Sequence, residues 1–210
     1  MKYLKKSLLF VLLFISTGAF SQLEPKFDAL GTIFGMSVVK AEYVINENIG
    51  AELSFNFRFG KPYLNSDYGS AKKQSGGGFK FEPRYYYSPD YDADGYYVGL
   101  YFRNQSLSYY YDENVYDSAR DIYVEKDNII SNKFSSVGLV LGYKYFFESG
   151  ITLDYGVGFG RFLSKSIESS LHGQRDRGEY DDYDYYFTFG VGYRFDWGEE
   201  KKVDADFEEF

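Results

Sequence analysis

The stretch SSVGLVLGYKYFF, residues 135–147, alternates large and small side chains with a strict period of two. Two later stretches repeat this pattern, ITLDYGVGFG at residues 151–160 and YDYYFTFGVGYRFDW at residues 183–197. In each of them one face carries bulky apolar or aromatic side chains, and the other carries glycine and polar or charged residues. A period of two predicts β-strands. Bulk on one face with glycine and charge on the other is typical of a strand that has lipid outside and a narrow lumen inside.

The first residues predict export. Lys2, Lys5 and Lys6 form a positive region, an apolar run follows at residues 8–15, and Ala19-Phe20-Ser21 has small residues at the −3 and −1 positions. This order is that of a secretory signal peptide, which we expect to be cleaved between Ser21 and Gln22. The alternative, a single transmembrane anchor, needs a longer apolar run.

Composition narrows the class of protein further. Removal of residues 1–21 takes away three of the 23 basic residues and none of the 31 acidic ones, so the net charge changes from −8 to −11. A chain this acidic is unsuited to nucleic acid. The sequence contains no cysteine, and its aromatic content is 22%. Tyrosine favours the membrane–water interface, where its apolar ring and its polar hydroxyl are both satisfied.

The alternation predicts an all-β fold, an eight-stranded antiparallel up-and-down transmembrane β-barrel at residues 22–197, followed by a charged periplasmic tail at residues 198–210. We place the strands at residues 26–32, 35–45, 49–59, 78–87, 95–110, 134–147, 151–160 and 183–197. Pro83 removes one ladder hydrogen bond, which predicts a local bulge.

The predicted connections alternate in length. Short turns fall at residues 46–48, 88–94 and 148–150, whereas long loops fall at residues 60–77, 111–132 and 163–182. Short periplasmic turns and long extracellular loops alternate in this way in outer-membrane barrels. The bend near residues 32–34 is then an unusually short outer connection.

The chain resembles small Gram-negative outer-membrane β-barrels. The segments that carry the resemblance are AEYVINENIGAELSFNF, FKFEPRYYYS, GYYVGLYFR, VGLVLGYKYFFESGITLDYGVGFG and FTFGVGYRFDW, which together span most of the chain after residue 21. They are most similar to a family catalogued as a domain of unknown function. The resemblance implies a barrel like OmpA or OmpX in shape, assembled by the barrel-assembly machinery, and it transfers no active-site residue. Such barrels commonly end on an aromatic residue of the last strand, whereas this chain continues beyond Phe195 to Phe210.

The inward positions of the predicted strands carry eight basic and six acidic residues. They are Lys26, Asp28, Lys40, Glu42, Glu52, Arg58, Lys80, Glu82, Arg84, Arg103, Lys144, Asp154, Asp184 and Arg194. An eight-stranded barrel is only wide enough for its own side chains, and buried charges must pair. We therefore expect a network of salt bridges that plugs the lumen; a narrow ion or small-solute channel through the network is the alternative. Inward glycines, such as Gly156, Gly158 and Gly160, would make room for the long Lys and Arg side chains.

No catalytic, metal or cofactor site is predicted, and we do not expect an enzyme. His172 is the single histidine and falls in a polar loop near Ser169 and Ser170, where a solvated residue is expected. The acidic residues of the loop at residues 111–132 could bind a divalent cation, but their spacing matches no EF-hand. Tyrosine clusters, such as Tyr85–Tyr87, are interpreted as interface and strand-end residues.

The sequence therefore predicts an outer-membrane protein with a structural or surface-interaction (adhesive) role. Its expected partners are outer-membrane lipid, the assembly machinery and an extracellular protein or glycan that contacts the loops. A soluble lipocalin-like carrier is the further alternative, and it would require the apolar faces to line a cavity.

Overall fold

The computed structural model describes residues 23–33, 36–60, 71–174 and 182–194. The predicted signal peptide at residues 1–21 and the tail at residues 198–210 lie outside the described residues. Within the described chain the elements are β1 (Leu23–Asp28), α2 (Ala29–Ile33), β2 (Met36–Asn46), β3 (Ile49–Gly60), β4 (Lys73–Tyr87), β5 (Gly95–Asp117), β6 (Ile122–Phe146), β7 (Ile151–Ser169), β8 (Gly173–Gln174) and β9 (Tyr183–Tyr193).

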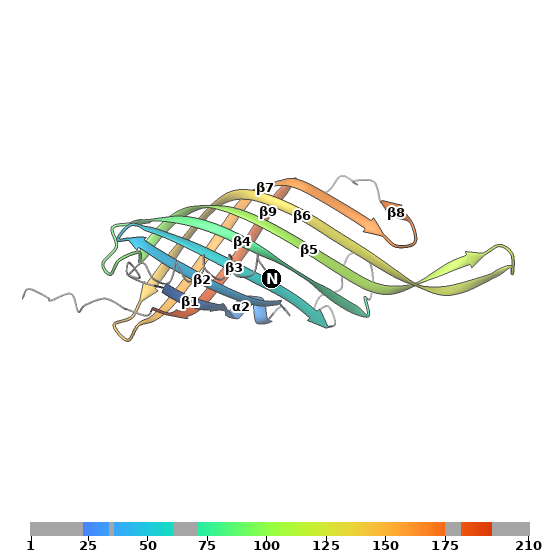
Figure 1. Ribbon diagram of the computed structural model, residues 1–210, viewed down its shortest axis with the longest axis horizontal. Helices are drawn as coiled ribbons and strands as arrows, with labels where there is room; N and C mark the ends of the chain where they lie inside the picture. Colours follow the sequence, from blue (N-terminus) through green and yellow to red (C-terminus); the bar gives the residue numbers. More distant parts are fainter. Residues whose placement is uncertain (1–22, 34–35, 61–70, 175–181, 195–210) are drawn as a thin grey trace, which may run out of the picture.

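Eight of the strands form a closed antiparallel ring (Figure 1). Sequence neighbours pair from β1 to β7, β7 pairs with β9, and β9 pairs with β1. Strand β8 pairs only with the end of β7 and lies outside the ring. This arrangement confirms the predicted all-β, eight-stranded up-and-down barrel.

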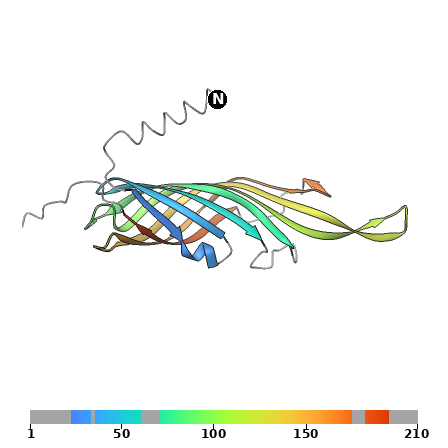
Figure 2. The ribbon, with the colours of Figure 1, turned by 60° about the horizontal axis from the view of Figure 1, so that its bottom comes forward.

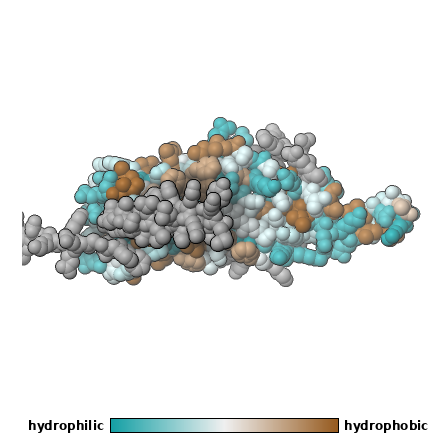
Figure 3. Space-filling view, in the orientation of Figure 1, coloured by the Kyte–Doolittle hydropathy of each residue, from teal (hydrophilic) through white to brown (hydrophobic). Residues whose placement is uncertain are grey.

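The side chains alternate across the barrel wall as predicted. In β2, Lys40, Glu42 and Val44 are buried, whereas Val39 and Tyr43 are exposed. The same alternation holds along the barrel portions of the other ring strands, and Figure 3 shows apolar patches on the barrel surface. Exposed positions on successive strands form an apolar belt, which includes Phe55, Phe81, Phe102, Leu139, Phe159 and Phe187.

The two ends of the barrel differ. At one end the strands are joined by the short connections at residues 47–48, 88–94 and 147–150. At the other end β5 and β6 continue as a long two-stranded hairpin that projects well beyond the ring (Figures 1 and 2). The long connections predicted at residues 60–77 and 163–182 fall at this second end, although residues 61–70 and 175–181 are outside the described chain.

The loop predicted at residues 111–132 is wrong, because these residues form strand. Strand β5 extends to Asp117 and β6 begins at Ile122, so only residues 118–121 form a turn. The same error makes two other predicted strands too short, since β4 begins at Lys73 and β7 continues to Ser169. Polar residues form these extensions by pairing with each other, so the apolar alternation that marks the belt is missing.

Three smaller expectations also need correction. The first strand is β1, residues 23–28, and residues 29–33 form the short helix α2 instead of its continuation. No bulge occurs at Pro83, since Phe81 pairs with Phe102 and Arg84 pairs with Gly99 in the same register on either side of it. The register shifts instead between Val44 and Asn46 and between Ser135 and Ser136.

Candidate functional site

The inward positions of the ring strands hold a charge network in the barrel lumen. Its centre is formed by two cations, Lys26 and Arg84, whose side chains are fully buried. The Lys26 ammonium lies 3.0 Å from Asp154 and 3.5 Å from Glu52, and it also contacts Glu42. Strands β1, β2, β3 and β7 are thus connected through one ammonium group.

Arg84 on β4 contacts four carboxylates. Its guanidinium nitrogens lie 2.6 Å from Asp154, 2.6 Å from Glu82, 3.0 Å from Glu52 and 3.4 Å from Glu42. The guanidinium also lies 4.4 Å from the centre of the Tyr97 ring. Charge-assisted contacts of this kind compensate the cost of burying the ions.

The network continues toward the end with the short turns. Glu24 accepts hydrogen bonds from Arg194 at 2.5 Å and from Lys144 at 3.1 Å. Arg194 also donates to the carbonyl of Tyr91 at 2.6 Å, which fixes the 88–94 turn across the barrel mouth. The sequence prediction missed Glu24 because it began the first strand at Lys26; continuing the alternation backward from Asp28 and Lys26 would have found it.

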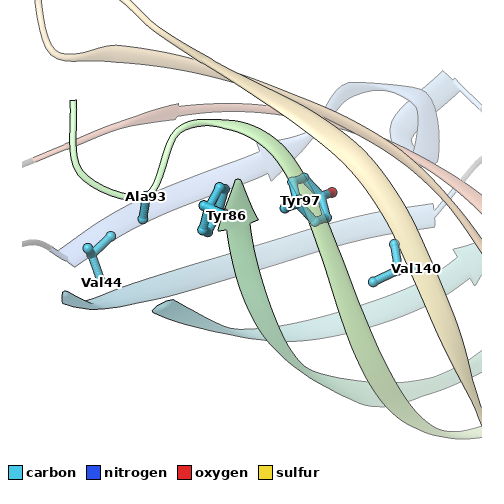
Figure 4. Packing of buried hydrophobic residues seen from close by; sticks show 5 residues of the cluster. All are labelled: Val44, Tyr86, Ala93, Tyr97 and Val140. Atoms are coloured by element: carbon cyan, nitrogen blue, oxygen red, sulfur yellow. The ribbon is translucent and has the colours of Figure 1, made fainter. Parts of the chain in front are cut away.

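An apolar cluster completes this end of the lumen (Figure 4). Its members come from β2, the 88–94 turn and three neighbouring strands, and they are Val44, Tyr86, Ala93, Tyr97 and Val140. The Ala93 amide donates to the Glu47 carbonyl at 2.6 Å, so the 88–94 turn folds against the neighbouring 46–48 turn. The short-turn end is therefore filled by both packing and ion pairs.

Toward the hairpin end the network continues in two further groups. Lys40 lies 2.7 Å from Asp28, which also accepts a hydrogen bond from Thr188 at 2.9 Å. Beyond them, Asp184 pairs with Arg103 and accepts a hydrogen bond from Tyr101 at 3.1 Å. The groups together fill the lumen from Arg194 to Arg103.

The structure thus brings together all but one of the predicted interior residues. Lys40, Glu42, Glu52, Lys80, Glu82, Arg84, Arg103, Lys144, Asp154, Asp184 and Arg194 each form at least one salt bridge. Arg58 is half-buried and forms no salt bridge within the described residues.

The inward glycines make room for tyrosine rings more than for Lys and Arg side chains, contrary to the prediction. A Cβ at Gly158 would lie 2.2 Å from the Tyr186 ring, and one at Gly142 would lie 2.4 Å from the Tyr97 ring. Tyr86 and Tyr186 point into the lumen, where the alternation of residues 78–87 and 183–197 places them. The interpretation of the tyrosine clusters as interface and strand-end residues does not hold for these two. At Gly192 the neighbour is Lys26, as expected.

Three buried carboxylates lie close enough to one another to coordinate a metal ion. Glu42, Glu52 and Asp154 have oxygens within 4.8 Å of one another, and no other such group occurs among the residues that the structure describes. The Lys26 ammonium and the Arg84 guanidinium contact all three. The protein's own cations therefore take the position that a metal ion would need.

Outside the barrel, the acidic residues of the hairpin interact with Lys72, the residue before β4. Asp112 pairs with Lys72, and a hydrogen bond from Lys72 is the main cause that lowers the pKa of Asp112. The hydrogen bond shared with Asp112 raises the pKa of Glu125. These carboxylates form no metal-ligating group within the described chain.

His172 lies beside the hairpin and makes a defined contact there. Its Nε2 is 2.7 Å from a Glu113 oxygen, and its side chain is 43% exposed. The hydroxyls of Ser169 and Ser170 donate to the Asn128 side chain at 3.0 and 3.2 Å. The His172 ring thus contacts Glu113, whereas both serine hydroxyls are directed to Asn128.

Comparisons with known proteins assign no family to the chain. No family model matches the chain, so the predicted domain-of-unknown-function family is not confirmed, and no curated protein matches it. Among solved structures, a major outer membrane protein from Thermus thermophilus is similar, with a TM-score of 0.42 and 15% identity over 83% of this chain and 98% of that chain. No helix in the described residues is long and apolar enough to cross a membrane.

Proposed function

We propose that the protein is an outer-membrane β-barrel with a closed, salt-bridged lumen, and that it acts structurally and through surface contacts made by its projecting hairpin. The observation that carries this proposal is the arrangement of the wall. Large apolar side chains face outward around the ring, with Phe187 74% and Leu141 61% exposed, whereas charged side chains face the lumen. A water-soluble protein rarely exposes so much contiguous apolar surface, but lipid satisfies it.

The same arrangement argues against the soluble carrier. A lipocalin-like barrel needs an apolar cavity, whereas this lumen holds Lys26, Arg84 and their carboxylates. A channel would need a wet path through these ion pairs, and nothing in the described contacts favours one. The role that we propose includes no catalysis.

The surface role rests on the hairpin. Between Asp112 and Asp127 it is acidic, and it carries the exposed side chains of Tyr116 and Tyr123, whose ring centres lie 5.3 Å apart. Aromatic rings with polar tips are common contact residues in protein and glycan recognition. The proposed partners are an extracellular protein or glycan at the hairpin and lipid around the belt.

Single-cysteine labelling on intact cells tests location and orientation together. The chain has no native cysteine. Ala119→Cys places a thiol in the hairpin turn and Ser149→Cys places one in the short turn at the other end. A membrane-impermeant maleimide is expected to label Ala119→Cys on whole cells, and to label Ser149→Cys only after the outer membrane is opened. Recovery of both variants in the soluble periplasm would contradict the proposal.

A further inference from the structure

A shallow depression lies on the outward face of β5, β6 and β7, with a volume of about 280 Å³. Its middle row consists of Gln105, Phe134 and Lys165, which pair with one another across the three strands. Since the residues on either side of this row face outward and side chains alternate along a strand, the main chain of the row forms the floor. The walls are the small or polar residues Asn104, Ser106, Lys133, Ser135, Ser164 and Ser166.

The depression begins where the apolar belt ends. Phe102 and Val137 are a cross-strand pair of the belt, and the next outward pair on the same strands is Asn104 with Ser135. Asn104 donates a hydrogen bond to Ser135 at 2.8 Å, and Ser135 pairs in turn with Ser164. In the membrane orientation proposed above, on which this step rests, the depression lies at the headgroups of the outer leaflet.

Two exposed cations are available to a ligand here: Lys133 in the wall of the depression, and Arg161 beside it, opposite Val137. The Lys133 ammonium lies 3.3 Å from Glu168, and the Arg161 guanidinium lies 3.3 Å from Asp182. All four side chains are more than half exposed. Exposed ion pairs contribute little free energy, so each cation can exchange its carboxylate for a phosphate, to which Lys and Arg also form charge-assisted bonds.

We propose that this depression binds the phosphorylated sugar headgroup of an anionic glycolipid in the outer leaflet. The serine hydroxyls and Asn104 would bond the sugar hydroxyls, while Lys133 and Arg161 would bind the phosphate. The acyl chains would lie against the belt below, next to Phe102 and Phe159. Hydroxyls, cations and apolar surface thus lie next to one another here, as sugar, phosphate and acyl chains do in such a lipid.

The test uses the full chain in phosphatidylcholine nanodiscs, titrated with a bisphosphorylated acylated glucosamine disaccharide and, separately, with its dephosphorylated form. We expect clear preference for the phosphorylated lipid. Lys133→Glu should weaken its binding about tenfold or more, since one charge-assisted contact is lost and a repulsion is added. Lys126→Glu is the matched control, because it makes the same charge change on β6, roughly 24 Å along the strand. Ser135→Trp, which fills the depression without a charge change, should also weaken binding.

Equal binding of both lipids, or equal affinity of wild type and Lys133→Glu, would overturn the inference. Displacement of the glycolipid by millimolar inorganic phosphate would also overturn it, because a site for the whole headgroup should not be satisfied by the free anion. Circular dichroism and co-migration with the nanodisc report insertion. A chain that fails to insert contradicts the proposed outer-membrane location, whereas an inserted barrel without lipid preference contradicts this inference alone.

Discussion

At the scale of single residues, each charge at the centre of the lumen is compensated by several partners. Lys26 and Arg84 share the carboxylates of Glu42, Glu52 and Asp154. Removal of one ion from such a cluster leaves its partners buried without compensation, which costs far more than the intact cluster contributes.

The substitution Arg84→Ala tests this dependence. It removes the contacts to four carboxylates and should destabilise the folded barrel by about 3–5 kcal/mol. Arg120→Ala is the control, since Arg120 is 73% exposed and lies 3.8 Å from Asp117, and its change should stay within about 0.5 kcal/mol. Urea unfolding in lipid vesicles measures both, and equal midpoints for the two variants would show that the ion cluster does not support the fold.

The tyrosine–glycine contacts give a second prediction at this scale. Gly158→Ala would place a Cβ 2.2 Å from the Tyr186 ring, and that ring is held through its hydroxyl by Glu82 at 2.7 Å. Overpacking of this kind costs about 1–3 kcal/mol. At Gly190 the nearest atom to an added Cβ is 3.6 Å away, so Gly190→Ala should unfold close to the wild-type urea midpoint. If the two variants unfold together, the Tyr186 ring is not confined by Gly158.

At the scale of elements, the sequence predicted the strands of the belt and missed their extensions. Alternation is visible where one face is apolar, as in residues 137–147, and it disappears where both faces are polar, as in Tyr111–Asn114 opposite Glu125–Asn128. Those residues are strand because β5 and β6 pair continuously from Gly95 to Asp117, so the register of the barrel wall continues into the polar part of the hairpin. The alternation of side chains along a single segment cannot reveal that two polar segments pair.

The charge network in the lumen shows the same limit of prediction from the sequence. Period two identified which residues face the lumen, but it could not identify their partners. Lys26 meets Asp154 across 128 positions of sequence, and this contact follows from the closure of the ring between β1 and β9. Glu24 was missed because the predicted start of a strand was too late in the chain.

The hairpin should be separable from the barrel. Residues 115–124 can be replaced by Asn-Gly, which joins Asn114 to Glu125, a cross-strand pair, through a tight turn. The contact of Glu113 with His172 is kept. Because the removed residues project beyond the ring, the urea midpoint should change little, whereas contact of expressing cells with a protein- or glycan-coated surface should fall. A shortened chain that fails to insert would show that the hairpin belongs to the folding unit.

At the scale of the whole molecule, ring closure leaves the barrel without sheet edges in its wall, and the lumen holds ion pairs and tyrosines from Arg194 to Arg103. An eight-stranded ring leaves little further space. We therefore expect purified protein in a planar bilayer to give no discrete conductance steps. Reproducible steps that disappear on denaturation would favour the channel.

In the proposed barrel, the apolar face of the wall meets lipid and the charged face meets the lumen. Leu139 pairs with Leu100, and the next residue of β5, Tyr101, faces the lumen beside Gly138, so Leu139 and Tyr101 mark opposite faces at nearly the same height. Tryptophan is introduced at each position in turn, in a Trp197→Phe background that removes the native tryptophan. Its fluorescence is then measured in vesicles of brominated lipid. We expect strong quenching of Leu139→Trp and weak quenching of Tyr101→Trp. Equal quenching of the two, or none for Leu139→Trp, would show that the apolar face does not meet lipid.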